Sequence, residues 1–199
     1  VKKELSNNKS RFFSDCEKAF RKKLPQNPDQ VPVLTGFFGF VPGGIINRVG
    51  RGYSDLTAAL TAAEMKADEL QIWKEIDGIY TADPRKVPEA RVLEVISPAE
   101  AAELTYFGSE VMHPFTMERA TQAQVCIRIK NTLAPEKSGT LILPEGLNGE
   151  NLKTRQSMQH TAIAVTAKNQ IRTINIHSNR MLHSSGFIAR VFDFFRKHE

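Results

Sequence analysis

The chain has 199 residues, of which 41% are hydrophobic and 25% are charged, and its formal net charge is +5. This composition is typical of a globular protein, and the lack of an apolar run of about 18 residues argues against a membrane-spanning helix. The excess positive charge lies within residues 1–24, where it predicts the solvated lysine face of an amphipathic helix and no nucleic-acid partner.

The N-terminal part of the chain predicts two helices and two strands. Residues 12–24 have the pattern of a helix, and the apolar run 31–40 predicts a buried strand. The glycine-rich residues 41–52 predict a long loop or hairpin. Residues 55–67 predict a helix of high propensity, and 69–76 a strand.

The middle of the chain continues this alternation after a long polar loop at 77–94. Residues 97–108 predict a helix in which Ser97 is the N-cap and Glu100 closes a capping box. A further helix is expected at 113–124 and a strand at 125–132. Strands that alternate with helices favour the α/β class with a mainly parallel sheet.

The composition changes after residue 143. Residues 144–160 lack apolar periodicity and predict a linker. Two apolar runs at 161–178 predict one or two strands, and they precede an amphipathic helix at 185–199. The two cysteines have no disulfide-like spacing and the five histidines no metal-ligand spacing, so we expect reduced thiols, a cytoplasmic location and no metal site in the protein itself.

The stretch GRGYSDLTAAL at residues 50–60 places an arginine and an aspartate at the start of a helix. A helix N-terminus attracts anions, and Ser54 or Asp55 could cap it. Arg51 suits a bidentate grip on a carboxylate, and Asp55 suits an ammonium group. Taken alone, the stretch is better explained as an ordinary turn and cap, because caps of this type are common.

Several blocks of the sequence occur together in one known family. In chain order they are TGFFGF, GRGYSDLTAAL, IWKEIDGIYTADPRKVPEAR, ELTYFGSEVMHPFTM, IRIKN and GTLI. Together they resemble the aspartokinases of the amino-acid kinase superfamily, and the fungal type in particular. The resemblance implies an α/β fold of three αβα layers, the carbamate kinase-like fold, with a mainly parallel sheet.

The resemblance also implies a domain organisation. Residues 1–145 would form the C-terminal half of the kinase domain, residues 146–160 a linker, and residues 161–199 the start of an ACT regulatory domain of ferredoxin-like α+β fold. The Lys-Phe-Gly-Gly-Thr segment with which the family begins does not occur here. We therefore expect a fragment with negligible activity by itself and no confidently assigned catalytic residue.

The implied reaction is the ATP-dependent phosphorylation of L-aspartate to 4-phospho-L-aspartate. This phosphotransfer to a carboxyl group is the first step toward threonine, methionine and isoleucine. The residues implied for the substrate are Arg51, Asp55, Ser54 and Phe37, with Thr35 and Gly36 as weaker candidates. Those implied for the nucleotide are Lys74, Glu75, Tyr80, Asp83 and Arg85. Mg²⁺ would accompany ATP, bound mainly by phosphate oxygens and water.

Some of these residues also have plain structural interpretations. Asp83 and Arg85 fit an ordinary turn around a proline, and Tyr80 fits a core position. Many bacterial relatives have a lysine where this chain has Glu110, so we expect Lys74 to supply the missing positive charge near the phosphates. The alternative is a surface pair between Lys74 and Glu110.

The C-terminal segment suggests regulation. The resemblance to an ACT module implies an amino-acid effector such as threonine, bound by Asn175, His177, Ser178 and Ser185, and a homo-oligomer formed through these modules. Two other functions stay open at this point. One is an amino-acid-binding regulatory protein derived from a kinase, and the other is a different kinase of the superfamily, for glutamate, acetylglutamate or uridylate.

Overall fold

The computed structural model describes residues 9–25, 27, 29–37, 39–40, 44–107, 111–144, 146–147, 162–177 and 186–198. The chain forms two compact units, Val1–Ala167 and Lys168–Glu199. Among the described helices, none has the length and apolar character needed to cross a membrane.

The helices of the first unit follow the predicted pattern closely. The predicted ones are α2 (Lys9–Lys23), α4 (Tyr53–Met65), α5 (Pro98–Phe107) and α6 (Pro114–Gln122), whereas α3 (Ile45–Arg48) was not predicted. The capping box of α5 is confirmed, because the N–H of Glu100 donates to Ser97 Oγ at 3.2 Å and the N–H of Ser97 donates to Glu100 Oε2 at 2.7 Å.

A four-stranded sheet forms the centre of the first unit. Its strands are β1 (Glu69–Lys74), β2 (Val95–Ile96), β3 (Cys126–Asn131) and β4 (Thr140–Ile142), in the spatial order β1-β3-β4-β2. The β1–β3 and β2–β4 pairs are parallel, and the β3–β4 pair is antiparallel. The predicted α/β class with a mainly parallel sheet is therefore confirmed.

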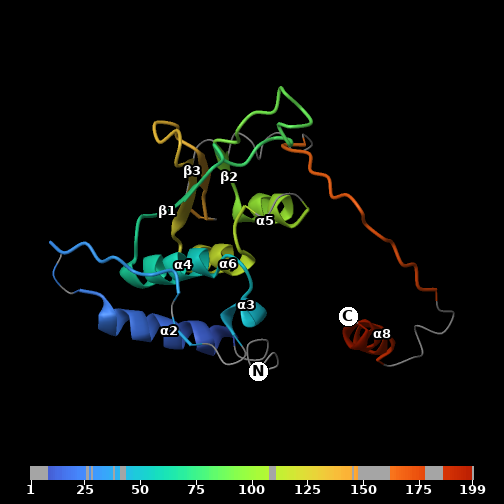
Figure 1. The fold of residues 1–199 in the computed structure, drawn as a ribbon, viewed down its shortest axis with the longest axis horizontal. Coiled ribbons are helices and arrows are strands. Elements are labelled where there is room, and N and C mark those ends of the chain that lie inside the picture. Colours follow the sequence, from blue (N-terminus) through green and yellow to red (C-terminus); the bar gives the residue numbers. More distant parts are fainter. Residues whose placement is uncertain are drawn as a thin grey trace. The chain divides into compact units, whose positions relative to one another are not determined.

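The main core lies between the sheet and the helices α4 and α6, which pack on each other and on β1 and β3 (Figure 1). Ile72 of β1 and Ile127 of β3 are buried in it. Leu70 and Ile72 are buried whereas Gln71 and Trp73 are exposed, so one face of β1 packs on this core and the other faces solvent.

A second core lies on the other side of α4, where α2 packs (Figure 1). It contains Phe13, Ile45, Val49, Leu56 and Leu60. Cys16 packs against this cluster, and burial together with the nearby Asp15 charge raises the pKa of its thiol to about 11. Both cysteines are free, as predicted.

Two predictions for residues 31–52 were wrong. The described part of 31–40 forms no strand, and Val31 and Val33 are 89% and 96% exposed. An apolar run becomes a strand only where another strand supplies hydrogen bonds, and none of the described strands pairs with it. The expected loop at 41–52 contains the short helix α3, whose Ile45 is buried in the second core.

The second unit contains α8 (Phe187–Lys197), which confirms the predicted C-terminal helix. The prediction of strands in the apolar runs of 161–178 was wrong for the described residues 162–177, which contain no strand. In the second run Ile171, Ile174 and Ile176 are exposed, so this run lacks the partner surface that a strand requires.

Candidate active site

The start of α4 carries most of the residues predicted to contact an amino-acid substrate. The N-cap is Gly52, which has the left-handed φ of 83° and makes no side-chain capping bond. The predicted capping role of Ser54 or Asp55 was therefore wrong, because both lie inside the first turn of the helix. Their side chains are left available for other contacts, and Arg51 is exposed in the turn just before the helix.

The segment with Phe37 lies against this helix start. Thr57 Oγ1 of α4 donates a hydrogen bond to the carbonyl oxygen of Gly36 at 2.6 Å. A Cβ atom on Gly36 would lie 2.7 Å from Ser54 Cβ, so only glycine allows this approach. The structure thus brings Gly36 beside Ser54, and Phe37 follows Gly36 as an exposed neighbour.

Lys74 and Asp55 form an ion pair between the two predicted halves of the site. Lys74 Nζ lies 3.2 Å from Asp55 Oδ2, and the side chains are only 27% and 18% exposed. Lys74 is the last residue of β1, and α4 precedes this strand in the chain. A residue predicted to bind nucleotide therefore contacts a residue predicted to bind the amino acid. Glu110, the alternative partner of Lys74, lies outside the described residues.

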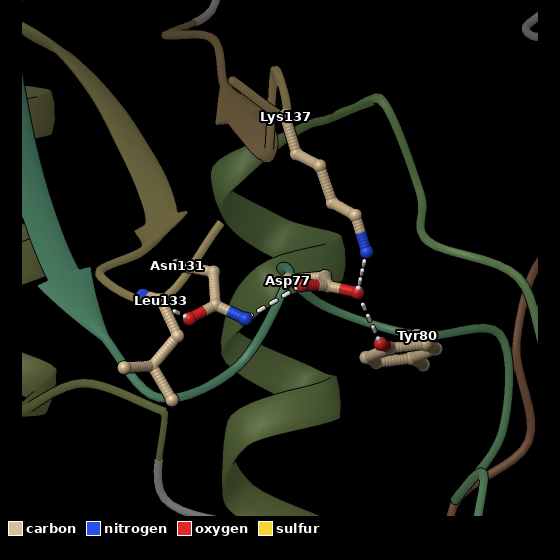
Figure 2. A network of polar contacts seen from close by, with 5 residues as sticks. All are labelled: Asp77, Tyr80, Asn131, Leu133 and Lys137. Carbon is tan, nitrogen blue, oxygen red and sulfur yellow. Dashed lines mark hydrogen bonds and ion pairs between the residues drawn. The ribbon is translucent and has the colours of Figure 1, made fainter. Parts of the chain in front are cut away.

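Asp77 is the centre of a polar cluster beside the end of β1 (Figure 2). Its carboxylate accepts hydrogen bonds from Asn131 Nδ2 at 2.7 Å, Lys137 Nζ at 2.7 Å and the Tyr80 hydroxyl at 3.2 Å. These bonds, that of Lys137 first and that of Asn131 next, hold the pKa of Asp77 below its usual value. Burial, followed by the Asp77 charge, raises the pKa of Tyr80.

The Asp77 cluster joins segments that are far apart in the sequence. Asn131 is paired with Lys74 in the parallel register of β3 and β1, so both side chains belong to the carboxyl ends of neighbouring strands. The carboxyl ends of parallel strands are the usual ligand-binding edge of open α/β sheets. Lys137 comes from the turn between β3 and β4, and half of its side chain is exposed.

The other residues predicted to bind the nucleotide make their hydrogen bonds within their own segment or are exposed. Arg85 donates to both carboxylate oxygens of Asp83, from Nε and from a terminal nitrogen, each at 3.0 Å. These bonds lower the pKa of Asp83. The backbone N–H groups of Lys86 and Val87 bond the Asp83 carbonyl, which makes this segment a local turn. Glu75 is exposed after the end of β1.

His113 has contacts that the sequence did not predict. It is the N-cap of α6, which fits the interpretation of His113-Pro114 as the start of a helix, and its Nδ1 accepts from the N–H of Phe115 at 3.1 Å. Its Nε2 also lies 2.7 Å from the carbonyl oxygen of Val49, in the turn that leads to Arg51.

The predicted effector residues lie in the second unit. Asn175 and His177 are exposed in an extended segment, and Ser178 and Ser185 lie outside the described residues. In the part of the chain that the structure describes, no group of three or more His, Cys, Asp or Glu side chains could hold a metal ion.

Sequence reasoning missed Asp77, Asn131, Lys137 and the second contact of His113. The sequence did contain a signal for Asp77 and Asn131. Asp77 directly follows the predicted strand 69–76, and Asn131 lies at the end of the predicted strand 125–132. Polar residues at the ends of parallel strands are expected to meet. No local signal marks Lys137, which reaches Asp77 from 60 residues further along the chain.

Residues 7–131 match the model of the amino acid kinase family. The chain is 54% identical to the aspartokinase of Candida albicans over 179 residues, which are 82% of this chain and 33% of the relative. It is 52% identical to the aspartokinase of Saccharomyces cerevisiae over 181 residues, which are 85% of this chain and 34% of the relative. It therefore spans about a third of the length of these relatives.

Among solved structures, E. coli aspartokinase III in complex with aspartate and ADP matches with a TM-score of 0.50 and 33% sequence identity. The match covers 74% of this chain and 31% of that structure. The resemblance inferred from the sequence blocks is thus confirmed, for the fold and for the fungal type.

Proposed function

Because the chain belongs to the amino acid kinase family, we propose that it is part of an aspartokinase. The whole protein would transfer the γ-phosphoryl group of ATP to the side-chain carboxylate of L-aspartate, giving ADP and 4-phospho-L-aspartate. The similarity to fungal aspartokinases supports this assignment. No observation favours the regulatory protein without catalysis.

The contact between Lys74 and Asp55 is the observation that carries the proposal. Phosphoryl transfer needs the acceptor carboxylate and the terminal phosphate in contact, and it depends on positioning and on neutralising charge. Lys74 at the end of β1 contacts Asp55 at the start of α4. In the proposed enzyme, the lysine would be the cation for phosphate and the aspartate the anion for the substrate ammonium group.

The ion pair also has a role before the ligands bind. Both side chains are largely covered, and a covered charge is costly without a partner. Each group therefore neutralises the other in the free protein. When both ligands bind, Asp55 would pair with the ammonium group of aspartate and Lys74 with the phosphates. Arg51 would bind a substrate carboxylate, with Ser54 and Phe37 on the pocket wall.

The nucleotide would lie along the carboxyl ends of β1 and β3. Glu75 and Tyr80 would be near the nucleoside, and Asp83 and Arg85 near the ribose and phosphates. The Asp77 cluster holds Tyr80 in place through its hydroxyl. Arg85 would have to exchange its bonds to Asp83 for bonds to a phosphate group.

The described residues fit a Mg²⁺ ion that arrives with ATP better than an ion held by the protein alone. The cations Lys74 and Lys137 suit the phosphate groups, whereas the described part of the chain has no cluster of metal-binding side chains. The ion would therefore be coordinated mainly by phosphate oxygens and water, and would offset their negative charge.

The remaining parts of the proposal concern the whole protein. Residues 1–145 belong to the kinase domain, 146–160 form the linker and 161–199 begin an ACT domain. An amino acid such as threonine would bind near Asn175 and His177, and the protein would be a cytoplasmic homo-oligomer. Its product would enter threonine, methionine and isoleucine biosynthesis.

The test is aspartate-dependent ADP formation by a protein of the relatives' full length that contains this chain. We expect ADP to form with ATP, Mg²⁺ and L-aspartate, and not when L-glutamate replaces L-aspartate. Activity with glutamate or uridine monophosphate but not with aspartate would contradict the proposal and favour another kinase of the superfamily.

A further inference from the structure

One histidine joins the turn that carries Arg51 to the start of a different helix. His113 Nε2 lies 2.7 Å from the carbonyl oxygen of Val49, and Nδ1 accepts a hydrogen bond from the N–H of Phe115 at 3.1 Å. A carbonyl can only accept and a backbone N–H can only donate, so both contacts require a neutral ring with its proton on Nε2. The ring thus donates to the turn before α4 and accepts from the first turn of α6.

The backbone on both sides of Arg51 lies close to this ring. Gly50 and Gly52 have left-handed φ values of 102° and 83°. A Cβ atom on Gly52 would lie 3.2 Å from the Cβ of His113, and one on Gly50 would lie 3.7 Å from its Nε2. The two glycines therefore let the turn pass closely over His113 while the arginine between them remains exposed.

The turn is held from outside α4. The N-cap of α4 is Gly52, which has no side chain to accept a hydrogen bond from the N–H groups of the first helical turn. The Val49 side chain is buried in the second core, and its carbonyl receives the His113 proton. His113 itself is held by its bond to α6 and by an edge-on contact with the Phe115 ring, whose centroid is 5.0 Å away. His113 thus connects α6 to a turn whose Val49 and Gly50 N–H groups are bonded to the Ile45 carbonyl of α3.

We propose that His113 is a positioning residue for Arg51. By holding the Val49 carbonyl, it fixes the turn at residues 49–52 and so the backbone from which Arg51 reaches the substrate carboxylate. The inference rests on the proposed function, because it assigns Arg51 to the substrate. A fixed starting point for a long side chain lowers the entropy lost when that side chain binds.

Two substitutions separate the two bonds of His113. In His113→Asn, the side-chain oxygen takes the place of Nδ1 and can still cap α6, but nothing donates to Val49. In His113→Gln, the amide nitrogen takes the place of Nε2 and can still donate to Val49, but the cap is lost. Each variant loses one neutral hydrogen bond, so we expect the free energy of unfolding to fall by a similar amount in both.

The variants are compared in a protein of the relatives' full length that contains this chain. We expect the KM for aspartate to rise about five-fold in His113→Asn, the effect of one lost hydrogen bond, and to stay within about two-fold in His113→Gln. The KM for ATP stays within about two-fold in both. An aspartate KM that rises equally in both variants, or in neither, rejects the positioning role.

A second measurement keeps this inference separate from the proposed function. If the unmodified protein does not phosphorylate aspartate, the proposed function fails. Hydrogen exchange at the amides of residues 50–52 still tests the hold of His113 on the turn. We expect faster exchange in His113→Asn than in His113→Gln, and equal rates in the two variants overturn the inference.

Discussion

Lys74 Nζ and Asp55 Oδ2 lie 3.2 Å apart, although 19 residues separate them in the sequence. The contact forms because α4 packs on β1, which brings the start of the helix to the carboxyl end of the strand. A cation and an anion of the proposed site therefore neutralise each other before any ligand binds.

The first prediction concerns this lysine. Lys74→Ala in a full-length protein should raise the KM for ATP several-fold, because the phosphates lose a cation and Asp55 is left without its partner. Steady-state kinetics at varied ATP measure the effect. Lys86→Ala is the matched control, since Lys86 is exposed in the nearby polar loop, and should leave this KM unchanged. An unaltered KM in Lys74→Ala would remove Lys74 from the nucleotide site.

The second prediction concerns the pH dependence of stability at Asp77. Its pKa is below the ordinary value of 3.8 in the folded state, so its bonds contribute stability at neutral pH. That contribution is lost as the pH falls below the ordinary pKa of an aspartate and through the lower pKa of Asp77 in the folded state. The difference in unfolding free energy between the unmodified chain and Asp77→Asn should therefore shrink between about pH 7 and about pH 3.

Urea unfolding at several pH values measures this difference. Asp68→Asn removes the same charge at an exposed position before β1 and serves as the control for the charge alone. A difference for Asp77→Asn that stays constant across the range would show that its carboxylate contributes nothing through these bonds.

The third prediction concerns Gly139 in the turn between β3 and β4. Its φ is +72°, and a Cβ atom there would lie 1.9 Å from the carbonyl oxygen of Ile129. Gly139→Ala should cost about 3 kcal/mol or more, from backbone strain and from displacement of β3.

Gly146→Ala isolates the backbone strain, because Gly146 also has positive φ but nothing lies within 4 Å of the added atom. It should cost about 1 kcal/mol. Thermal unfolding compares the two variants. Equal costs would show that the close contact with Ile129 is relieved without loss of stability.

The fourth prediction compares two serines near helix starts. Ser97 accepts from the N–H of Glu100, so Ser97→Ala should lower the free energy of unfolding by about 1 kcal/mol. Ser54 does not cap α4, so Ser54→Ala should change it by less than about 0.5 kcal/mol. Denaturant unfolding distinguishes them. A larger loss in Ser54→Ala than in Ser97→Ala would contradict the assigned caps.

The sequence by itself determined the elements whose signals are local. The capping box of Ser97 and Glu100 marks the start of α5, and the high helix propensity of 55–67 marks α4 to within two residues. The family resemblance also came from local blocks, and it implied that Phe37, Ser54 and Asp55 belong to one site.

Only the tertiary structure decided the contacts between distant segments. The positions of Asp77 and Asn131 at strand ends were visible in the sequence, but their contact depends on which strands are neighbours. The bonds of Lys137 to Asp77 and of His113 to Val49 depend on the packing of distant segments, which no local pattern encodes. The same reason explains why the prediction of a strand at 31–40 was wrong. A helix closes its hydrogen bonds within its own segment, whereas a strand depends on a partner elsewhere in the fold.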